Sequence, residues 1–173
     1  MKIDVNRLTF QKLEIDSVPL LLEVQEEAFE YAKGNTDFLR RNTAETLSVC
    51  FEGESVVLGV FDKDTLAGFG ILFVAGEGKE NLAYDADEVK DVNTSANVKL
   101  IIVRPDYRGN GLQVELVKRL QESAKKSGFE WLCATVAPTN SYSYDNFVKS
   151  GFTHTKTLTK YGGLTRALFV KKI

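Results

Sequence analysis

The chain has 173 residues, of which 43% are hydrophobic and 27% are charged, and its formal net charge is -2. These values are typical of a soluble globular protein, and we expect a single domain over residues 1–173. The scattered basic residues predict no nucleic-acid-binding face, and no segment is apolar for long enough to act as a signal peptide or to span a bilayer.

Cysteine and histidine are rare in this chain. Cys50 and Cys133 are far apart in the sequence, which favours reduced, buried thiols in a cytoplasmic protein over a disulfide framework. The chain contains one histidine, His154, and no CxxC pair, so we expect no metal site. We expect His154 to be a surface strand residue rather than a catalyst.

The N-terminal segment predicts a strand followed by a helix. Apolar and polar residues alternate over Leu8–Leu13, which indicates a strand. A helix is expected over Val18–Ala32, with Asp16 or Ser17 as its cap and Gly34-Asn35 as its end. Its expected apolar stripe consists of Leu21, Val24, Ala28 and Tyr31.

A second helical stretch is expected over residues 36–51, capped by Thr36 or Asp37. Two apolar strands then follow, over 55–62 and 65–76, and the turn between them predicts a hairpin. The polar segment Glu77–Ala96 is irregular, and connections of this length are often functional or mobile.

The next part of the chain predicts a strand, a helix and a strand. Val98–Val103 is almost continuously apolar, as expected at the centre of a sheet. Leu112–Ser127 has helical apolar spacing and is followed by Gly128, and the strand 130–136 comes next. Such a βαβ unit has parallel strands and a right-handed crossover.

The C-terminal segment predicts a short helix over 140–151 and two closing strands joined by the turn Gly162-Gly163. Because most connections are hairpins, we expect a mixed α/β (α+β) sheet that is largely antiparallel, with one parallel pair near its middle.

The loop Arg104–Gly111 lies where ligands bind in open α/β sheets, beyond the carboxyl end of a parallel strand. Gly109 and Gly111 lack side chains, Arg108 adds charge, and the following helix starts with unpaired N–H groups, so the loop predicts a pyrophosphate cradle. The alternative is a tight turn with Asn110 as the helix N-cap. The loop matches neither a Walker A motif nor a GxGxxG motif.

The context of this loop favours the first interpretation. The stretch VRPDYRGNGL after an apolar strand resembles the acetyl-CoA-binding motif of the GNAT family, the Gcn5-related N-acetyltransferases. That motif has Arg or Gln, two residues, Gly, one residue, and Gly or Ala. The downstream stretch VAPTNSYSYDNFVKSGF is similar to the family's strand, asparagine, helix and Gly-Phe segment. The resemblance is specific over residues 98–152 and rests on element order over 1–76.

The resemblance implies a GNAT-type fold, with a mostly antiparallel sheet of about seven strands, a central parallel βαβ unit and about four helices. It implies an N-acetyltransferase that moves an acetyl group from acetyl-CoA, its co-substrate, to a primary amine of a small molecule or peptide by direct attack. The expected protein is a monomer or homodimer without a metal. Two alternatives remain open: a non-catalytic acyl-CoA sensor on the same fold, and a protein-interaction domain in which the loop is only a turn.

The resemblance also implies site residues. Arg108 and the following backbone amides would hold the pyrophosphate of coenzyme A, the backbone of the central strand would pair with the pantetheine arm, and Asn140 would contact that arm while also capping a helix. Phe147 stands where many members carry the tyrosine that protonates the departing thiolate. The residues expected to bind the co-substrate are Ile101, Ile102, Val103, Arg108, Gly109, Asn110, Gly111, Leu112, Gln113, Asn140 and Phe147.

Three positions depart from the family pattern. Gln113 replaces a small residue, and we expect its amide to point sideways or to donate to a phosphate. With Phe147 at the acid's position, Tyr142 and Tyr144 are the nearby substitutes, but a thiolate is a tolerable leaving group and neither should be indispensable. Lys99 stands where the central strand often carries a glutamate base.

We therefore expect water or a carboxylate of the 77–96 segment to deprotonate the amine, with Asp85 as the first candidate. The negative charge of this segment would also favour a cationic acceptor. The other candidate carboxylates are Asp87, Glu88 and Asp91 in the same segment, and Glu27 and Glu30 in the first helix.

Overall fold

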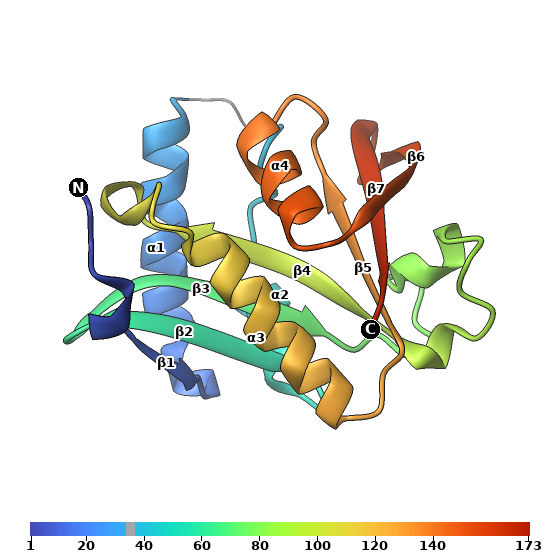
Figure 1. Ribbon diagram of the computed structural model, residues 1–173, viewed down its shortest axis with the longest axis horizontal. Helices are drawn as coiled ribbons and strands as arrows, with labels where there is room; N and C mark the ends of the chain where they lie inside the picture. The colour runs from blue at the N-terminus through green and yellow to red at the C-terminus, as the bar shows by residue number, and fades with distance from the viewer. Residues whose placement is uncertain (34–36) are drawn as a thin grey trace.

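The computed structural model describes residues 1–33 and 37–173, and its centre is a seven-stranded sheet with helices on both faces (Figure 1). The strand order is β1-β2-β3-β4-β5-β7-β6. The strands are β1 (Thr9–Lys12), β2 (Val56–Asp62), β3 (Thr65–Phe73), β4 (Ser95–Val103), β5 (Trp131–Val136), β6 (Thr153–Lys160) and β7 (Leu164–Lys172). The helices are α1 (Val18–Ala32), α2 (Ala44–Ser48), α3 (Leu112–Lys126) and α4 (Ser141–Lys149).

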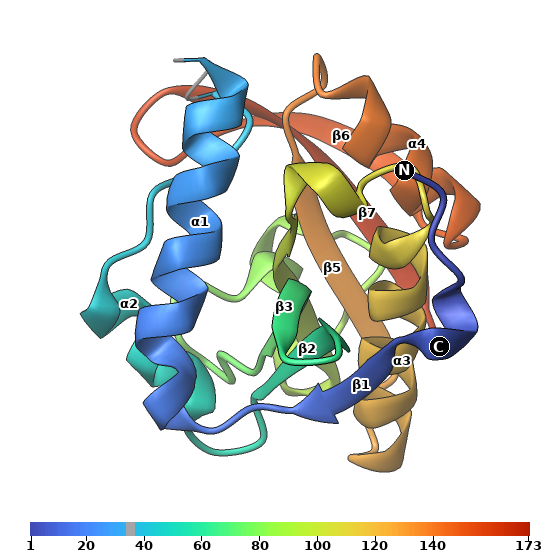
Figure 2. The ribbon, with the colours of Figure 1, turned by 90° about the vertical axis from the view of Figure 1, so that its left-hand side faces the viewer.

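The two faces of the sheet are covered by different helices. α1 and α2 lie on one side of the strands, and α3 and α4 lie on the other (Figure 2). The parallel pair is β4 with β5, and the other neighbouring strands are antiparallel. The predicted architecture, a mostly antiparallel mixed sheet with one parallel pair and four helices, is therefore confirmed.

β4 and β5 separate along their length. They are paired only from Ser95 to Asn97 on β4 and from Trp131 to Cys133 on β5. Beyond these residues β4 remains paired with β3 as far as Val103, and β5 remains paired with β7. A gap therefore opens inside the sheet, between the C-terminal halves of its two parallel strands.

A bulge lies on β4 at the start of this gap. Leu100 is opposite Ile71 and Val98 is opposite Leu72, so Lys99 is an extra residue without a partner on β3. A β-bulge changes the direction of a strand and aims its side chain away from the regular alternation. The bulge therefore helps to turn the end of β4 away from β5.

α1 has the predicted bounds, but its contacts differ from the prediction in two respects. Leu21, Val24 and Ala28 are buried, whereas Tyr31 is 61% exposed and lies under the guanidinium of Arg108. Ser17 occupies the N-cap position without a side-chain hydrogen bond to the helix. The predicted end at Gly34-Asn35 and the predicted cap Thr36 lie outside the described residues.

The second predicted helix is much shorter than expected. α2 begins at Ala44, its cap is Thr43 rather than Asp37, and a single 3-10 turn, Val49–Phe51, follows it. The segment before α2 is held by Gln25 of α1, whose side chain accepts from the Asn42 N–H at 2.8 Å and donates to the Asn42 carbonyl at 3.0 Å. These tertiary bonds replace the backbone bonds that a longer helix would have made.

The polar segment 77–94 is folded rather than irregular. It forms 3-10 turns at Leu82–Asp85 and Val92–Thr94 and covers part of β5 and β7 on the α1 side of the sheet (Figure 1). Asn81 is buried at its centre, where its side chain donates to the carbonyls of Gly76 and Val92. A buried, fully bonded amide holds this segment in place, so the prediction that it is irregular is wrong.

Two further predictions are confirmed. Cys50 and Cys133 are free, buried thiols, and burial raises the pKa of Cys133 to about 12. The hairpin turns lie at Lys63-Asp64 and at Tyr161–Gly163, and Tyr161, Gly162 and Gly163 all have positive φ. Within the described part of the chain, no helix is both long and apolar enough to cross a membrane.

Candidate functional site

A cavity of about 860 Å³ opens at the gap between β4 and β5. Gln113 of α3 and Ser143 and Phe147 of α4 line it from one face of the sheet. Residues of α1, of the segment 38–42 and of the segment 79–82 line it from the other face. A ligand in this cavity can therefore extend from one face of the sheet to the other through the gap.

The loop before α3 presents bare backbone at one end of the cavity. Gly109 and Gly111 have φ values of 78° and 75°, and a Cβ at either position would have nothing within 4 Å. Gly111 is the N-cap of α3, and no side chain caps this helix among the described residues. The first N–H groups of α3 and its positive dipole end therefore stay available to an anion.

The side chain of Asn110 holds the loop instead of capping the helix. Its Oδ1 accepts from the Ile3 N–H at 2.9 Å, and its Nδ2 donates to the Tyr107 carbonyl at 3.0 Å. The alternative that Asn110 is the N-cap is therefore wrong. The N-terminal segment instead fixes the outer side of the loop.

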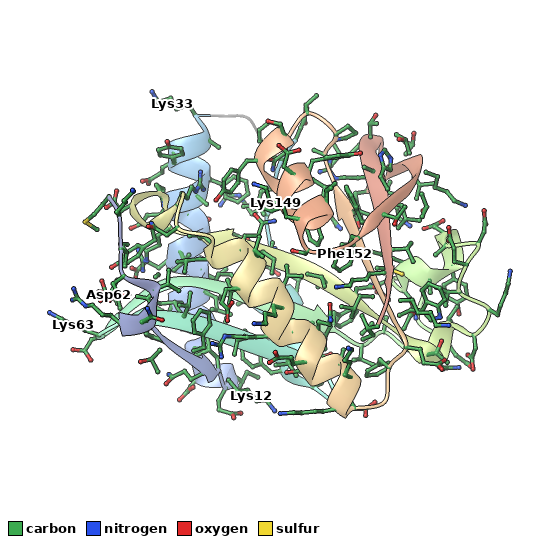
Figure 3. The ribbon with its side chains drawn as sticks, in the orientation of Figure 1. Lys12, Lys33, Asp62, Lys63, Lys149 and Phe152 are labelled. Atoms are coloured by element: carbon green, nitrogen blue, oxygen red, sulfur yellow. The ribbon has the colours of Figure 1, made fainter. Side chains whose placement is uncertain are left out.

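Two more side chains anchor the loop to the body of the protein. Arg104, largely buried, donates to the carboxylates of Glu23 and Glu27 on α1, at 2.8 and 2.6 Å. The Tyr107 hydroxyl donates to Asp62 at 3.2 Å, at the end of β2 (Figure 3). Glu27, one of the candidate bases, thus serves as an ion-pair partner of the loop.

Gln113 is turned sideways, which is one of the two orientations expected for it. Its Nε2 donates to the Ser143 Oγ at 3.0 Å, and its Oε1 accepts from Asn146 at 3.2 Å. Asn140 caps α4 by accepting from the Ser143 N–H at 3.3 Å, and its side chain also lines the cavity. The extra amide at position 113 therefore joins α3 to α4 and leaves the loop open.

The backbone of β4 faces the gap at alternate residues. The Arg104 N–H donates to the Ala67 carbonyl of β3 at 2.8 Å, so the backbone groups of Val103 and Ile101 point the other way, towards the gap. The Val103 carbonyl accepts there from the Nε of Arg108 at 3.1 Å. Of the three strand residues predicted to pair with pantetheine, Ile102 has its backbone directed at β3, opposite Phe69.

The three predicted catalytic residues lie in different places. Tyr142 lines the cavity at its loop end, where its hydroxyl accepts from the Gly109 N–H at 3.4 Å. Tyr144 lies outside the lining of the cavity, and its hydroxyl is 2.8 Å from Nδ1 of His154. Asp85 also lies outside this lining and forms an ion pair with Lys160.

Glu80 is the acidic residue among the described residues that line the cavity, and the sequence did not single it out. Its backbone carbonyl accepts from the buried side chain of Asn97 at 2.9 Å, which places the residue beside β4. Asp87 pairs instead with Lys156 at 3.1 Å. No local motif distinguishes Glu80 from the other acidic residues of its segment, because its position depends on the folding of that segment onto β4.

The cavity lining is basic. Among the described residues that line it, one, Glu80, is acidic and seven are basic, so the expected negative acceptor side is wrong for this cavity. The acidic residues of the 77–96 segment that form ion pairs, Asp85 and Asp87, are directed at lysines of β6. The basic lining residues are Arg40, Arg41, Lys79, Lys99, Arg108, Lys160 and Arg166.

Metal-binding side chains are not grouped in the described residues. Over residues 1–33 and 37–173, no cluster of three or more His, Cys, Asp or Glu side chains could hold a metal ion.

Comparison with solved structures shows the same fold in several acetyltransferases. An N-acetyltransferase from Thermoplasma acidophilum, in complex with coenzyme A, has 19% identity and a TM-score of 0.69, and the match covers 96% of this chain and 99% of that one. The ribosomal-protein-S18-alanine N-acetyltransferase of Escherichia coli has 16% identity and a TM-score of 0.70, with 96% and 94% covered. Aminoglycoside acetyltransferase AAC(6')-Ib, in complex with coenzyme A and kanamycin, has 15% identity and a TM-score of 0.69, with 95% and 94% covered.

Among curated proteins, none matches this sequence. The model of the acetyltransferase (GNAT) family matches residues 18–152. This range includes α1, α4 and the loop Arg104–Gly111 before α3, called the glycine loop below. The predicted enzyme class and co-substrate, an acetyltransferase with acetyl-CoA, are thereby confirmed at the level of the family. The chain belongs to the acetyltransferase (GNAT) family.

Proposed function

We propose that the protein is an N-acetyltransferase that binds acetyl-CoA at the loop before α3 and acetylates a primary amine held on the α1 side of the gap. The observation that carries this proposal is the uncapped start of α3, where two glycines at positive φ leave backbone N–H groups open beside a large cavity. The compared structures that contain coenzyme A support the choice of ligand.

The residues of the loop fit a pyrophosphate. The amides of residues 109–113 would hold its oxygens, and the open space at Gly109 and Gly111 allows phosphate to approach the backbone closely. Arg108 lines the cavity beside the loop and supplies a positive charge. Tyr142 would exchange its weak contact with the Gly109 N–H for a contact with the ligand.

The exposed edge of β4 fits the pantetheine arm. A chain with amide groups can pair with the backbone of Ile101 and Val103 as an added strand would, because these groups face the gap. Asn140 and Phe147 border the same space. This arrangement would place the thioester near the bulge at Lys99, where β4 and β5 part.

The reaction we propose is direct transfer. The neutral amine nitrogen bonds to the acetyl carbonyl carbon, the carbon–sulfur bond breaks, and the sulfur leaves as a thiolate that takes up a proton from water. A backbone N–H of β4 that faces the gap near this bulge would polarise the carbonyl. The amine proton would pass to the side chain of Glu80, the acidic residue that lines the cavity, directly or through water.

Coenzyme A binding measured by calorimetry tests the placement of the co-substrate. Gly111→Val puts methyl groups where the pyrophosphate would lie, and we expect affinity to fall at least about a hundredfold, because several charge-assisted hydrogen bonds would be lost. Gly128→Val is the matched control. Gly128 follows the other end of α3, has a φ of 85°, and has similar open space, so it carries the same backbone strain far from the loop.

A folded Gly111→Val protein that binds coenzyme A as tightly as the wild type would place the site elsewhere. Tight binding by the wild type, combined with no turnover of acetyl-CoA with any amine, would favour the non-catalytic acyl-CoA sensor instead.

A further inference from the structure

The charges of the cavity point to the chemistry of the acceptor. We propose that the acceptor carries an anionic group, a carboxylate or a phosphate, in addition to the amine that is acetylated. This inference rests on the proposed function, because it concerns the part of the same cavity that the co-substrate would leave open.

The basic residues divide between the two ends of the cavity. Arg108 belongs to the loop end, where the co-substrate pyrophosphate would lie. Arg166 lies at the other end: on β7 its side chain shares a face with Leu168 and Val170, which pack under the segment 82–89. Ala167 and Phe169 point the opposite way, into the core under α3 and α4. The remaining basic lining residues come from segments 40–41, 79, 99 and 160, which also lie away from the glycine loop.

Arg166 is a buried charge that forms no ion pair among the described residues, although the carboxylate of Asp37 is near enough to act on its pKa. Its side chain lines the cavity although the residue is only 4% exposed. It donates to the carbonyls of Thr165 and Asp37, at 2.9 and 2.5 Å, and forms no ion pair. Burial lowers the pKa of Arg166, yet a guanidinium stays charged at neutral pH. A buried charge of this kind is stabilised by an anion that can accept from its fork of N–H groups.

Three more basic residues at this end lack a carboxylate within ion-pair distance over the described part of the chain. Arg40 lies over the ring of Tyr161 at 4.0 Å, and Lys99 lies over the ring of Phe73 at 4.6 Å. Lys79 stands beside Glu80 on the segment that borders β4. Only Arg41 and Lys160 are neutralised, by Glu26 and Asp85 respectively.

The ring of Tyr161 lies near both arginines. The guanidinium carbon is 4.0 Å from the ring centroid for Arg40 and 6.0 Å for Arg166, and the Tyr161 hydroxyl is 2.9 Å from the Thr135 Oγ1 on β5. The φ of Tyr161, 54°, is set by the β6–β7 turn. Two cations from distant segments thus lie near one ring at the border of the cavity.

A cleft with one sign of charge concentrates ligands of the opposite sign. A simple cationic amine would be repelled here, whereas an amine that carries an anion would be held by it. The surrounding cations would also lower the pKa of the acceptor's ammonium group, because a nearby like charge disfavours the charged form. The same charges would therefore both select the acceptor and supply the neutral amine that attacks the thioester.

Turnover of acetyl-CoA with matched acceptors tests the inference. One set compares 4-aminobutyrate with butylamine and 1,4-diaminobutane, a second compares phosphoethanolamine with ethanolamine, and a third compares the common amino acids with their amides. We expect kcat/KM for the anion-bearing member of at least one set to exceed that of its neutral partner by about tenfold or more, as expected for one well-placed charge pair. The first and second sets distinguish carboxylate from phosphate.

Preference for the neutral or doubly cationic amines would overturn the inference. So would a protein that binds coenzyme A but acetylates no anion-bearing member. If the wild-type protein did not bind coenzyme A at all, the proposed function would be contradicted instead. Failure of the inference and failure of the proposed function are therefore distinguishable.

Charge reversal identifies the responsible end of the cavity. Lys99→Glu should lower kcat/KM for the preferred anionic acceptor by about tenfold or more and leave the Kd of coenzyme A within about twofold. Lys12→Glu is the matched control. Lys12 is an exposed lysine on β1, outside the cavity lining. Figure 3 shows it at the opposite edge of the molecule from Lys33, which follows the cavity-lining residue Ala32 at the end of α1.

Arg166→Met removes the buried charge, and we expect the same selective loss from it. If this variant does not fold, Arg40→Glu takes its place, because Arg40 is an exposed side chain at the same border. Equal kcat/KM in wild type, Lys99→Glu and Arg40→Glu would overturn the inference.

Discussion

The two ends of the cavity differ in the groups that they present. The loop end offers backbone N–H groups, two glycines and one arginine, all within residues 108–113. The other end offers charged side chains from five separate segments, and its one carboxylate, Glu80, lies among six basic residues. Backbone groups suit a ligand portion that never changes, such as a pyrophosphate, because side-chain substitution leaves them in place. Side chains suit a variable ligand, because each can be exchanged without moving the sheet.

The compared structures agree with this division. They share the fold at 15–19% identity, yet one of them is an aminoglycoside acetyltransferase in complex with kanamycin and another is a ribosomal-protein-S18-alanine N-acetyltransferase. The difference between the two ends therefore separates what the fold provides from what this chain adds. Three measurements, besides those above, can break or sharpen this separation.

The largest effect is expected at Glu80. Glu80→Gln should lower kcat/KM about a hundredfold and remove the acidic limb of its pH profile, because a positioned general base typically contributes a factor of about 10²–10⁴. Asp85→Asn should lower kcat/KM less, because Asp85 forms an ion pair with Lys160 and lies outside the cavity lining. The control is Glu88→Gln, an exposed residue of the same segment. An unchanged profile in Glu80→Gln together with a displaced limb in Asp85→Asn would assign the base to Asp85.

A smaller effect for each pH unit, about tenfold in the folding equilibrium, is expected from Cys133, where the paired part of β4 and β5 ends. Burial raises the pKa of its thiol from 9.0 to about 12, with Glu88 and Asp85 adding to the shift. The protonated thiol thus stabilises the folded state fully below the unfolded pKa, and this contribution is lost as pH rises from about 9 to about 12. The free energy of unfolding should fall by about 1.4 kcal/mol per pH unit there from this group.

Cys133→Ala should remove that part of the slope in urea unfolding measured across this range. Equal slopes in the two proteins would show that Cys133 ionises as readily in the folded state as in the unfolded chain.

The smallest effects are expected from the two predicted tyrosines. Tyr142→Phe and Tyr144→Phe should each keep most of the turnover, because Tyr142 contacts the loop end and Tyr144 is bonded to His154 outside the cavity lining. A thiolate with a reference pKa of about 8.5 can leave without a general acid. A fall of about 10³ in kcat with unchanged KM for either variant would identify that tyrosine as the acid.

Several parts of the fold and of the site could be predicted from local sequence. Apolar spacing gave α1 its bounds, and it gave α3 its buried stripe of Leu112, Leu116, Val117, Leu120 and Ala124. The glycine loop could be recognised because all its groups are adjacent in the chain and its chemistry depends on the backbone. The sideways orientation of Gln113 was one of the two that the sequence left open.

The failures share a physical cause. The second helix was predicted over residues 36–51, with residue 36 or 37 as its cap, because these residues are compatible with a helix. The side chain of Gln25 instead hydrogen-bonds the backbone N–H and carbonyl of Asn42, so the segment before α2 is not helical. Asp85 and Asp87 were candidate bases because they are acidic and close to β4 in sequence, yet lysines of β6 attract both. Each outcome depends on a partner that lies far away in the chain.

The sequence by itself determined the family, the order of the elements and the place of the glycine loop, because periodicity, turn residues and backbone exposure are local properties. Only the tertiary structure decided the character of the acceptor end. The parting of β4 from β5, the bulge at Lys99 and the folding of the 77–94 segment bring Glu80, Lys99 and Arg166 to one cavity. Charge acts through space rather than along the chain, so an acidic segment in the sequence borders a basic cavity in the folded protein.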